Sequence, residues 1–304
     1  MTRTLLSHRR LVIRGWALPQ HPCCSVRCFR DGFTLVELLV VLALLLVWVM
    51  MLAPGLARTQ PSTRSSRCLN NQRQLIAAWK MYAADNSDKV INNFGAAETS
   101  SEISNGTYRN WANNIIDYSL NPSNTNTTPL SVSLFAPYLN RNTSVYRCPA
   151  DNYVSSVQAA LGWTARVRSI SMNAYMGPYS PSFTSGANSF FPAFRQFLKS
   201  SLISKPASLF VFLDEHPDSI NDAYFLNNAD PQALTSWLDL PASYHNGGCA
   251  FSFPDGHAEM ILWKSNATKL PVHISGGFQQ IPFVASDGGT LDRDWITSHS
   301  SVRF

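Results

Sequence analysis

Five titratable side chains lie close together in the C-terminal half of the chain. They are Asp214, Glu215, His216, Asp218 and Asp222. Carboxylate oxygens at this density are ligands that Ca²⁺ prefers, so Asp214, Glu215, Asp218 and Asp222 are candidate calcium ligands. The spacing departs from an EF-hand loop, because Phe225 stands where the bidentate Glu would be. A solvated acidic turn is the competing interpretation.

A second pair with chemical potential is His245 and Asp255, which could act as a general base and its orienting carboxylate. Nine residues of a predicted hairpin strand separate them. An extended strand of that length holds its ends about 20 Å or more apart. The sequence also has no Gly-x-Ser-x-Gly nucleophile elbow. We therefore predict that His245 stabilises its turn, that Asp255 forms the Asx residue of the following turn, and that the chain is not an enzyme.

The elements that must position these residues are one helix and several strands. Residues 58–84 place an apolar stripe at helical spacing, which predicts a helix that packs on a sheet. The members of the stripe are Cys68, Gln72, Leu75, Trp79 and Tyr82. Strands are predicted at 169–175, 209–213, 249–253 and 257–263, the last two as a hairpin. The expected fold class is α+β, with an antiparallel sheet.

An uncharged apolar run extends from Leu38 to Ala53, with Glu37 at its threshold. Counted from Phe33, the segment would form about 31 Å of helix, enough to cross a hydrocarbon core of about 30 Å. We predict a membrane-spanning helix. A carboxylate at such a position is costly unless it is paired, which indicates a functional role for Glu37. Pro61 is expected to bend or interrupt the helix.

The string Gly32-Phe33-Thr34-Leu35-Val36-Glu37 ahead of this run resembles the cleavage and methylation signal of type IV prepilins and type II secretion pseudopilins. The resemblance implies that a prepilin peptidase cuts after Gly32 and methylates Phe33. It also implies that Glu37 neutralises the amine of a neighbouring subunit, and that Pro54 matches the kink-forming proline of the pilin helix. A conventional signal peptide cleaved near Gly55-Leu56-Ala57 is the rival interpretation.

Three further strings resemble a poorly understood subset of pseudopilin-like proteins. They are Cys68 to Leu75 together with Met81 to Asn86, Arg147 to Asp151, and the pattern His245-x9-Asp255-Gly256 near the C-terminus. The resemblance implies a pilin-like fold, in which a long N-terminal transmembrane and amphipathic helix packs on the sheet.

Three cysteines follow the predicted cleavage site: Cys68, Cys148 and Cys249. A disulfide between Cys68 and Cys148 would fasten the sheet domain to the helix and would stabilise the fold by about 4–5 kcal/mol at most. Two unpaired core cysteines are the alternative. We predict the disulfide, with Cys249 as a free thiol on a strand.

The net charge of +5 resides in the segment 1–32, which holds six Arg and one Asp. The rest of the chain is neutral, which gives no support to nucleic-acid binding. We expect a leader at 1–32, a transmembrane and amphipathic helix at 33–88, and a β-rich periplasmic head at 89–304. The expected partners are a prepilin peptidase, other pilin-like subunits and the inner membrane, with the N-terminus cytoplasmic.

Two functions remain open. The first is a structural or accessory subunit of a type II secretion or type IV pilus-like assembly. The second is a membrane-tethered binding module for glycans that uses exposed aromatic side chains. The candidate aromatics are Trp111, Trp163 and Trp237. Residues 92–130, rich in Asn, Ser and Thr, are expected to form long surface loops with Trp111 as the main anchor and one short helix, for which residues 130–139 are the better candidate.

Overall fold

The computed structural model describes residues 34–274 and 282–304, with side chains except those of residues 49–63. The chain divides into two compact units at the boundary between Pro54 and Gly55. We call residues 55–304 the second unit. The predicted cleavage residues, Gly32 and Phe33, lie outside the described residues. The predicted domain boundaries at 32 and 88 remain predictions.

Helix α1 (Leu35–Asp85) contains 51 residues. Pro61, which was expected to bend or interrupt the helix, does not interrupt it. A reciprocal capping box begins the helix: the Glu37 N–H donates to Thr34 Oγ1, and Glu37 Oε2 accepts from the Thr34 N–H at 2.8 Å. The helix ends where Ser87 and Asp88 adopt positive φ angles. In the described part of the chain, no helix combines the length and the apolar character needed to cross a membrane.

The second unit contains one five-stranded sheet with the order β3-β1-β2-β4-β5. The strands are β1 (Ile170–Asn173), β2 (Phe212–Asp214), β3 (Tyr224–Phe225), β4 (Gly248–Ser252) and β5 (Ala258–Leu262). The predicted hairpin is confirmed, because β4 and β5 pair antiparallel from Gly248↔Leu262 to Ser252↔Ala258. The α+β class is also confirmed. The expectation of a wholly antiparallel sheet is wrong, because β1 and β3 pair in parallel.

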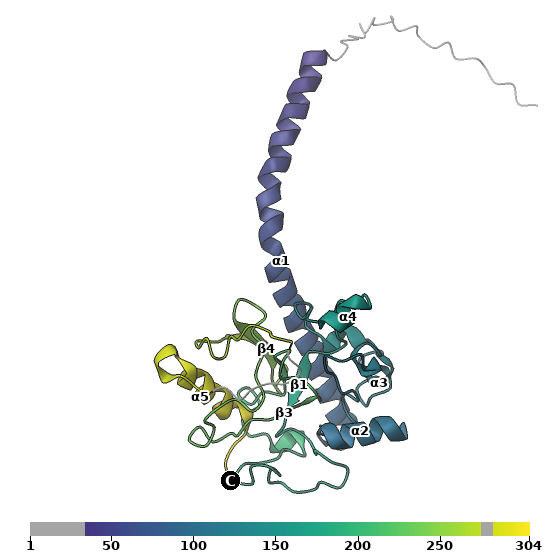
Figure 1. Cartoon of the computed structure of the whole chain (residues 1–304), viewed down its shortest axis with the longest axis vertical. Coiled ribbons are helices and arrows are strands. Elements are labelled where there is room, and N and C mark those ends of the chain that lie inside the picture. The colour runs from purple at the N-terminus through teal and green to yellow at the C-terminus, as the bar shows by residue number, and fades with distance from the viewer. Residues whose placement is uncertain (1–33, 275–281) are drawn as a thin grey trace, which may run out of the picture. The chain divides into compact units, whose positions relative to one another are not determined.

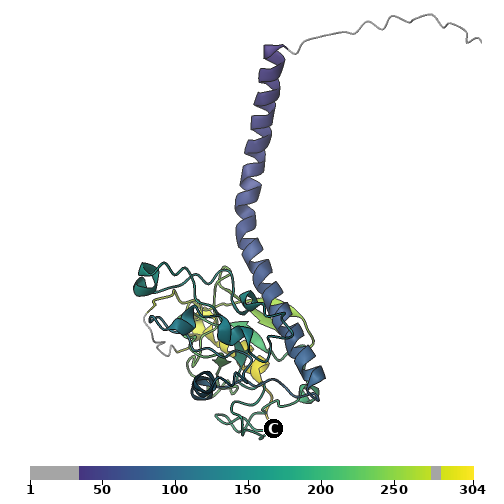
Figure 2. The same cartoon turned by 90° about the vertical axis from the view of Figure 1, so that its right-hand side faces the viewer.

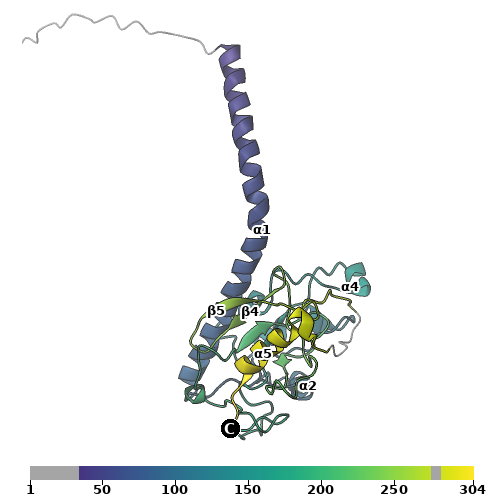
Figure 3. The same ribbon diagram turned by 90° about the vertical axis from the view of Figure 1, so that its left-hand side faces the viewer.

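Two helices cover the two faces of the sheet, and Figure 1 shows the strands between α1 and α5 (Gly289–Ser300). The predicted stripe of α1 is confirmed as core: Leu75, Ile76 and Trp79 pack in one cluster with Phe212. On the opposite face, Ile296 of α5 packs in a cluster with Phe251. The view in Figure 3 has α5 in front of β4 and β5.

Alternation along the strands assigns each side chain to one of these two layers. In β4, Ala250 lies in a cluster with Cys68 of α1, whereas its neighbour Phe251 faces α5. In β2, Phe212 packs toward α1 and Leu213 packs toward α5. The next residue, Asp214, therefore faces α1 again, where it contacts Cys68. A carboxylate is thereby delivered to the buried face beneath α1.

The remaining elements are short. They are α2 (Ala96–Asn105), η1 (Pro122–Asn124), α3 (Thr128–Ser131), η2 (Thr143–Tyr146), α4 (Ser156–Ala160), η3 (Ser200–Leu202) and η4 (Ala285–Asp287). The C-terminal residue lies at the end of the second unit where α1 ends (Figure 2). Besides loops, the segment 92–130 contains the short helix α2, which lies earlier in the chain than the expected 130–139, and the buried residues Phe94, Trp111 and Ile116.

Candidate functional site

Four side chains of metal-ligand type meet beneath α1: Cys68, Cys148, Asp214 and His245. Their ligand atoms all lie within 4.8 Å of one another. Cys68, Cys148 and Asp214 are fully buried, and His245 is 9 % exposed. We call these four residues the Cys-Cys-Asp-His group. No other group of three or more such residues occurs among residues 34–274 and 282–304.

Four separate elements supply the group. Cys68 lies on the buried stripe of α1, and Asp214 ends β2 on the same side of the sheet. Cys148 follows the 3₁₀ helix η2, and its N–H donates to Ser169 Oγ at 2.7 Å just before β1. His245 precedes β4 in a turn in which Asn246 and Gly247 both have positive φ angles.

Two close contacts connect these residues in pairs. The Cys68 Sγ–H donates to Asp214 Oδ2 at 2.7 Å. Cys148 Sγ lies 3.2 Å from Nε2 of His245, and the other ring nitrogen of His245, Nδ1, lies 3.1 Å from Ser65 Oγ on α1. Asp214 Oδ1 is buried without a hydrogen-bond partner in the described structure. The carboxylate is therefore only half satisfied by protein groups.

Burial disfavours the charged form of every member of the group. It raises the pKa of Asp214 to about 7 and lowers the pKa of His245. Burial also raises the pKa of the Cys148 thiol. The pKa of Cys68 is raised well above its ordinary value, first by its hydrogen bond to Cys148 and then by burial. Without a cation, the site favours neutral thiols and a neutral imidazole.

The predicted disulfide is absent, because Cys68 and Cys148 are both free cysteines in this structure. The two cysteines lie close together, as the predicted disulfide requires. However, the Cys68 thiol contacts Asp214, and the Cys148 thiol contacts His245. The prediction for Cys249 is confirmed: it is a free, buried thiol on β4. Its Sγ–H donates to the backbone carbonyl of Asp214 at 3.1 Å, and it is not a member of the group.

The predicted calcium site does not form in the described structure, because its four carboxylates do not meet in one ligand group. Only Asp214 reaches such a group. Glu215 accepts from Ser219 Oγ at 2.7 Å. The two remaining carboxylates accept backbone hydrogen bonds: Asp218 from residues 273 and 274, and Asp222 from residue 224. Alternation along β2 and the turn after it point these side chains in different directions.

The two ends of the His245-x9-Asp255-Gly256 pattern both contact α1. His245 lies against Ser65, while the Asp255 carbonyl accepts from Lys80 Nζ at 2.8 Å. The Asx turn predicted at Asp255 is confirmed, because Asp255 Oδ1 accepts from the His257 N–H at 3.0 Å. His245 lies in the predicted turn, but its ring contacts Cys148 and Ser65, which the prediction of a turn-stabilising side chain did not include.

Between these ends, β4 follows α1 through Gln72. The Gln72 amide donates to the Ala250 carbonyl at 3.3 Å, and its Oε1 accepts from Ser252 Oγ at 2.9 Å. From Ser65 to Lys80 the helix rises about 22 Å. The five residues of β4 span about 17 Å, and the turns at both ends supply the rest.

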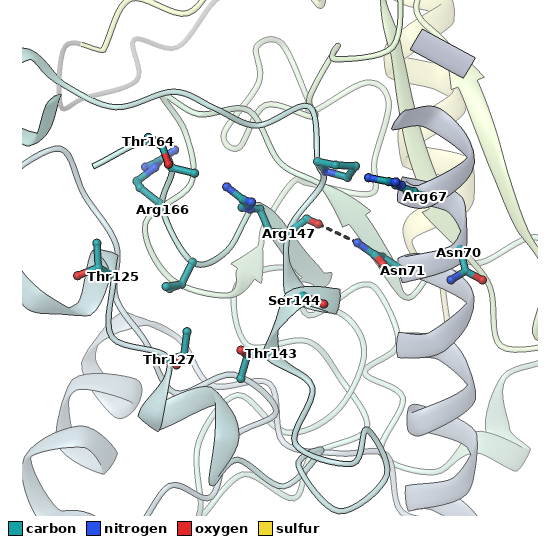
Figure 4. A pocket seen from close by; sticks show the side chains of 13 residues that line it. Arg67, Asn70, Asn71, Thr125, Thr127, Thr143, Ser144, Arg147, Thr164 and Arg166 are labelled. Carbon is teal, nitrogen blue, oxygen red and sulfur yellow. Dashed lines mark hydrogen bonds between the residues drawn. The ribbon is translucent and has the colours of Figure 1, made fainter. Parts of the chain in front are cut away.

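A cavity of about 520 Å³ lies between α1 and the loops beside it (Figure 4). Its lining includes the guanidinium groups of Arg67, Arg147 and Arg166. Asn71 donates to the Arg147 carbonyl at 2.9 Å at one side of the cavity. Arg166 is buried, and its Nε and Nη1 atoms have no hydrogen-bond partner in the described structure. Both atoms are shielded from solvent, and Nη2 of Arg166 donates to the Pro217 carbonyl at 3.3 Å. Arg67 and Arg147, which are not fully buried, are therefore the basic side chains that an anionic ligand in this cavity would meet.

The aromatic platform expected for a glycan-binding module does not form. Trp111 and Trp237 are fully buried, and Trp163 is partly buried. Trp111 stacks on Tyr146 with a centroid separation of 5.7 Å and packs against Phe212 of the sheet. The prediction that Trp111 anchors its segment is confirmed, but its ring is not available to a ligand.

In the first unit, the structure describes Glu37 but not the predicted cleavage residues Gly32 and Phe33. Glu37 Oε2 accepts from both the N–H and the hydroxyl of Thr34 at 2.8 Å. The apolar side chains of residues 35–48 are exposed on all sides of α1. The predicted apolar run continues to Ala53, and its last residues lie outside the described side chains.

Comparison with known families identifies the N-terminal segment. Residues 29–53 match the family described as the prokaryotic N-terminal methylation motif. No curated protein and no solved structure matches the chain. The matched segment includes Gly32, Phe33 and Glu37, and the whole second unit lies outside the match. The chain therefore carries the N-terminal signal of type IV pilin-like prepilins, which is processed by a prepilin peptidase and serves assembly with other pilin subunits.

Proposed function

We propose that this chain is a structural or accessory subunit of a type II secretion or type IV pilus-like assembly. The peptidase cuts between Gly32 and Phe33, and the segment from Phe33 anchors the mature chain in the inner membrane. The second unit is then displayed in the periplasm and has no enzymatic role. The chain belongs to the pseudopilin-like subset with a C-terminal His-x9-Asp-Gly pattern.

The observation that carries this proposal is the match of residues 29–53 to the methylation motif, with Glu37 at the expected position. The exposed apolar surface of residues 35–48 adds to it, because an apolar surface of this extent requires lipid or other helices around it. In this proposal, lipid surrounds the N-terminal helix before assembly, and the helices of neighbouring subunits surround it afterwards.

Glu37 has two separable roles in this proposal. Within its own chain it caps α1, together with Thr34. Between chains its negative charge pairs with the Phe33 amine of a neighbouring subunit. Gln preserves the capping box but removes the charge, whereas Ala removes both. The pair Glu37→Gln and Glu37→Ala therefore distinguishes the cap from the charge.

The test combines processing and assembly in cells that contain the peptidase. Mass spectrometry should find a mature N-terminus at N-methylated Phe33 in the wild type and in both variants, because the scissile residues are unchanged. An amine left unpaired in apolar surroundings costs about 3–5 kcal/mol. Membrane crosslinking should therefore detect at least about tenfold fewer oligomers of both variants.

Three outcomes would contradict the proposal. An N-terminus near Arg58 would indicate an ordinary signal peptide. If Glu37→Gln crosslinks as well as the wild type, the charge of Glu37 is not needed for assembly, and its role is helix capping alone. Equal crosslinking of wild type and Glu37→Ala would favour a tethered module over an assembly subunit.

A second candidate function is a tethered binding module whose ligand would bind in the cavity beside α1 and not on the tryptophan side chains, two of which are fully buried. An acidic saccharide would place its carboxylate against Arg67 and Arg147, which line the cavity and are not fully buried. Calorimetric titration with glucuronate-containing oligosaccharides tests it. Binding that is lost in Arg147→Met would support the module, and no heat of binding to the wild type would exclude this ligand class.

A further inference from the structure

We infer that Cys68, Cys148, Asp214 and His245 bind one structural Zn²⁺ ion that fastens α1 to the sheet. The four residues supply two sulfurs, one imidazole nitrogen and one carboxylate oxygen, each of which is a ligand that zinc accepts. Their ligand atoms lie within 4.8 Å of one another on four separate elements. A tetrahedral site needs four ligands converging in this way.

The separations suit zinc after small side-chain movements. Zinc–ligand distances of about 2.0–2.3 Å place neighbouring ligand atoms about 3.3–3.8 Å apart in a tetrahedron. Cys148 Sγ and His245 Nε2 are 3.2 Å apart, close to this range. Cys68 Sγ and Asp214 Oδ2 are 2.7 Å apart and would separate by about 1 Å as the thiol proton is replaced by the ion.

The surroundings of the ligands also match a metal site. Nδ1 of His245 lies 3.1 Å from Ser65 Oγ, which leaves Nε2 directed at the site and fixes the ring orientation. The Ala150 N–H donates to Cys148 Sγ at 3.4 Å, a contact that stabilises a thiolate. Asp214 Oδ1 is buried and lacks a partner in the described structure, and a cation would compensate this carboxylate.

The ligand set discriminates among metals and among roles. Ca²⁺ and Mg²⁺ prefer sites built from oxygen, which this group is not. Four protein ligands in a buried setting leave no open position for water or substrate, which is typical of structural and not catalytic zinc. Binding as two thiolates releases the two thiol protons to solvent.

Zinc would join segments that are distant in the sequence. Cys68 belongs to α1, whereas Cys148, Asp214 and His245 belong to the loops and strands that α1 covers. His245 also begins the His-x9-Asp-Gly pattern, so the inference gives that histidine a chemical role. The ion replaces the predicted disulfide as the link between the helix and the sheet.

The test uses the full mature chain in detergent, purified without chelators. Elemental analysis should find about one zinc ion per chain in the wild type. Cys148→Ser, Asp214→Asn and His245→Ala should each lose most of it. Cys249→Ser is the matched control, because this buried cysteine neighbours Asp214 but is not a ligand, and it should retain the ion. Ser65→Ala should weaken zinc affinity about tenfold, since it removes the partner of the ligating imidazole.

A second measurement does not depend on how the variants fold. Wild-type protein stripped by a chelator is titrated with Co²⁺, and thiolate-to-cobalt charge transfer with intense tetrahedral absorption bands should appear at about one equivalent.

Three results would overturn the inference. The first is a wild-type chain without bound zinc that shows no thiolate–cobalt absorption. The second is a mass lower by two hydrogens with thiols released only by reductant, which would establish the disulfide. The third is full zinc retention in the folded ligand variants, which would identify an adventitious ion only.

Discussion

Asp222 is a buried carboxylate outside the Cys-Cys-Asp-His group, and its titration should be measurable in the stability of the second unit. It is 8 % exposed, and its Oδ1 accepts from the Tyr224 N–H at 3.0 Å. Burial raises its pKa to about 6 from an ordinary value of 3.8, although that hydrogen bond and the charge of Arg168 act in the opposite direction. The folded state therefore binds a proton here more tightly than the unfolded state does.

The size and sign of the effect follow from this difference. About two pKa units correspond to about 3 kcal/mol. The contribution of Asp222 to the free energy of unfolding is most favourable below about pH 4, falls as the pH rises from 4 to 6, and stays low above that window. Asp222→Asn keeps an oxygen acceptor for Tyr224 and carries no charge. It should match the wild type near pH 4 and exceed its stability by up to about 3 kcal/mol near pH 7.5.

Urea unfolding of the full chain in detergent, followed by tryptophan fluorescence across this pH range, measures the difference. Distant carboxyls titrate alike in both proteins. The charge of Asp222 also raises the pKa of the buried Glu215 and Asp239, so the difference curve reports Asp222 together with its effect on these two groups. Asp294→Asn, the same change at an exposed position of α5, is the control and should shift stability by less than about 0.5 kcal/mol. A difference that does not vary with pH, or a variant that loses most stability at high pH, would refute the reasoning.

Two further predictions concern packing around α1 and β1. Gln72→Leu and Ser252→Ala should each destabilise by about 1–3 kcal/mol, because each leaves a buried partner unpaired, and the double variant should cost less than their sum. A strictly additive cycle by urea unfolding would contradict this contact. Gly177 has a φ of 80°, and a Cβ there would lie 2.0 Å from the Ile91 carbonyl oxygen. Gly177→Ala should therefore lower stability by at least about 2 kcal/mol, whereas Gly186→Ala, with open space around it, should be nearly neutral; equal unfolding midpoints for the two would disprove the clash.

Local periodicity predicted the parts of the fold that depend on one segment at a time. The stripe from Cys68 to Trp79 has helical spacing, and it is buried against the sheet. The alternation from Cys249 to Phe253, followed by the turn at Asp255, predicted the β4–β5 hairpin. In both cases the side chains that must be buried repeat with the period of the element itself.

Contacts between distant segments could not be predicted in this way. No spacing in the sequence indicates that β3 pairs in parallel with β1, because that pairing depends on how the segment 174–223 between them, which includes η3 and β2, folds. The sequence alone assigns the members of the Cys-Cys-Asp-His group to three unrelated roles. It predicts that the two cysteines form a disulfide, that Asp214 binds calcium and that His245 stabilises a turn. No short ligand motif such as Cys-x-x-Cys connects them, so only the folded chain brings them together.

The fixed length between His245 and Asp255 has a physical reason in the contact of β4 with α1. Both ends of the pattern meet one rigid helix, at Ser65 and at Lys80. Because successive strand residues face opposite sides, one added residue would turn Ala250 and Ser252 away from α1 and bring the aromatic face of β4 against it.

Gly256 has a φ of 108°, a backbone conformation that residues with a side chain rarely adopt, and a Cβ there would also lie 3.3 Å from Lys80 Nζ of α1. Histidine at one end, Asp-Gly at the other and nine residues between them are thus what a strand needs to lie along α1 in one register. A zinc ion at His245 would fix that register at the end nearer the N-terminal segment, where a filament subunit must hold its helix firmly to the domain that it carries.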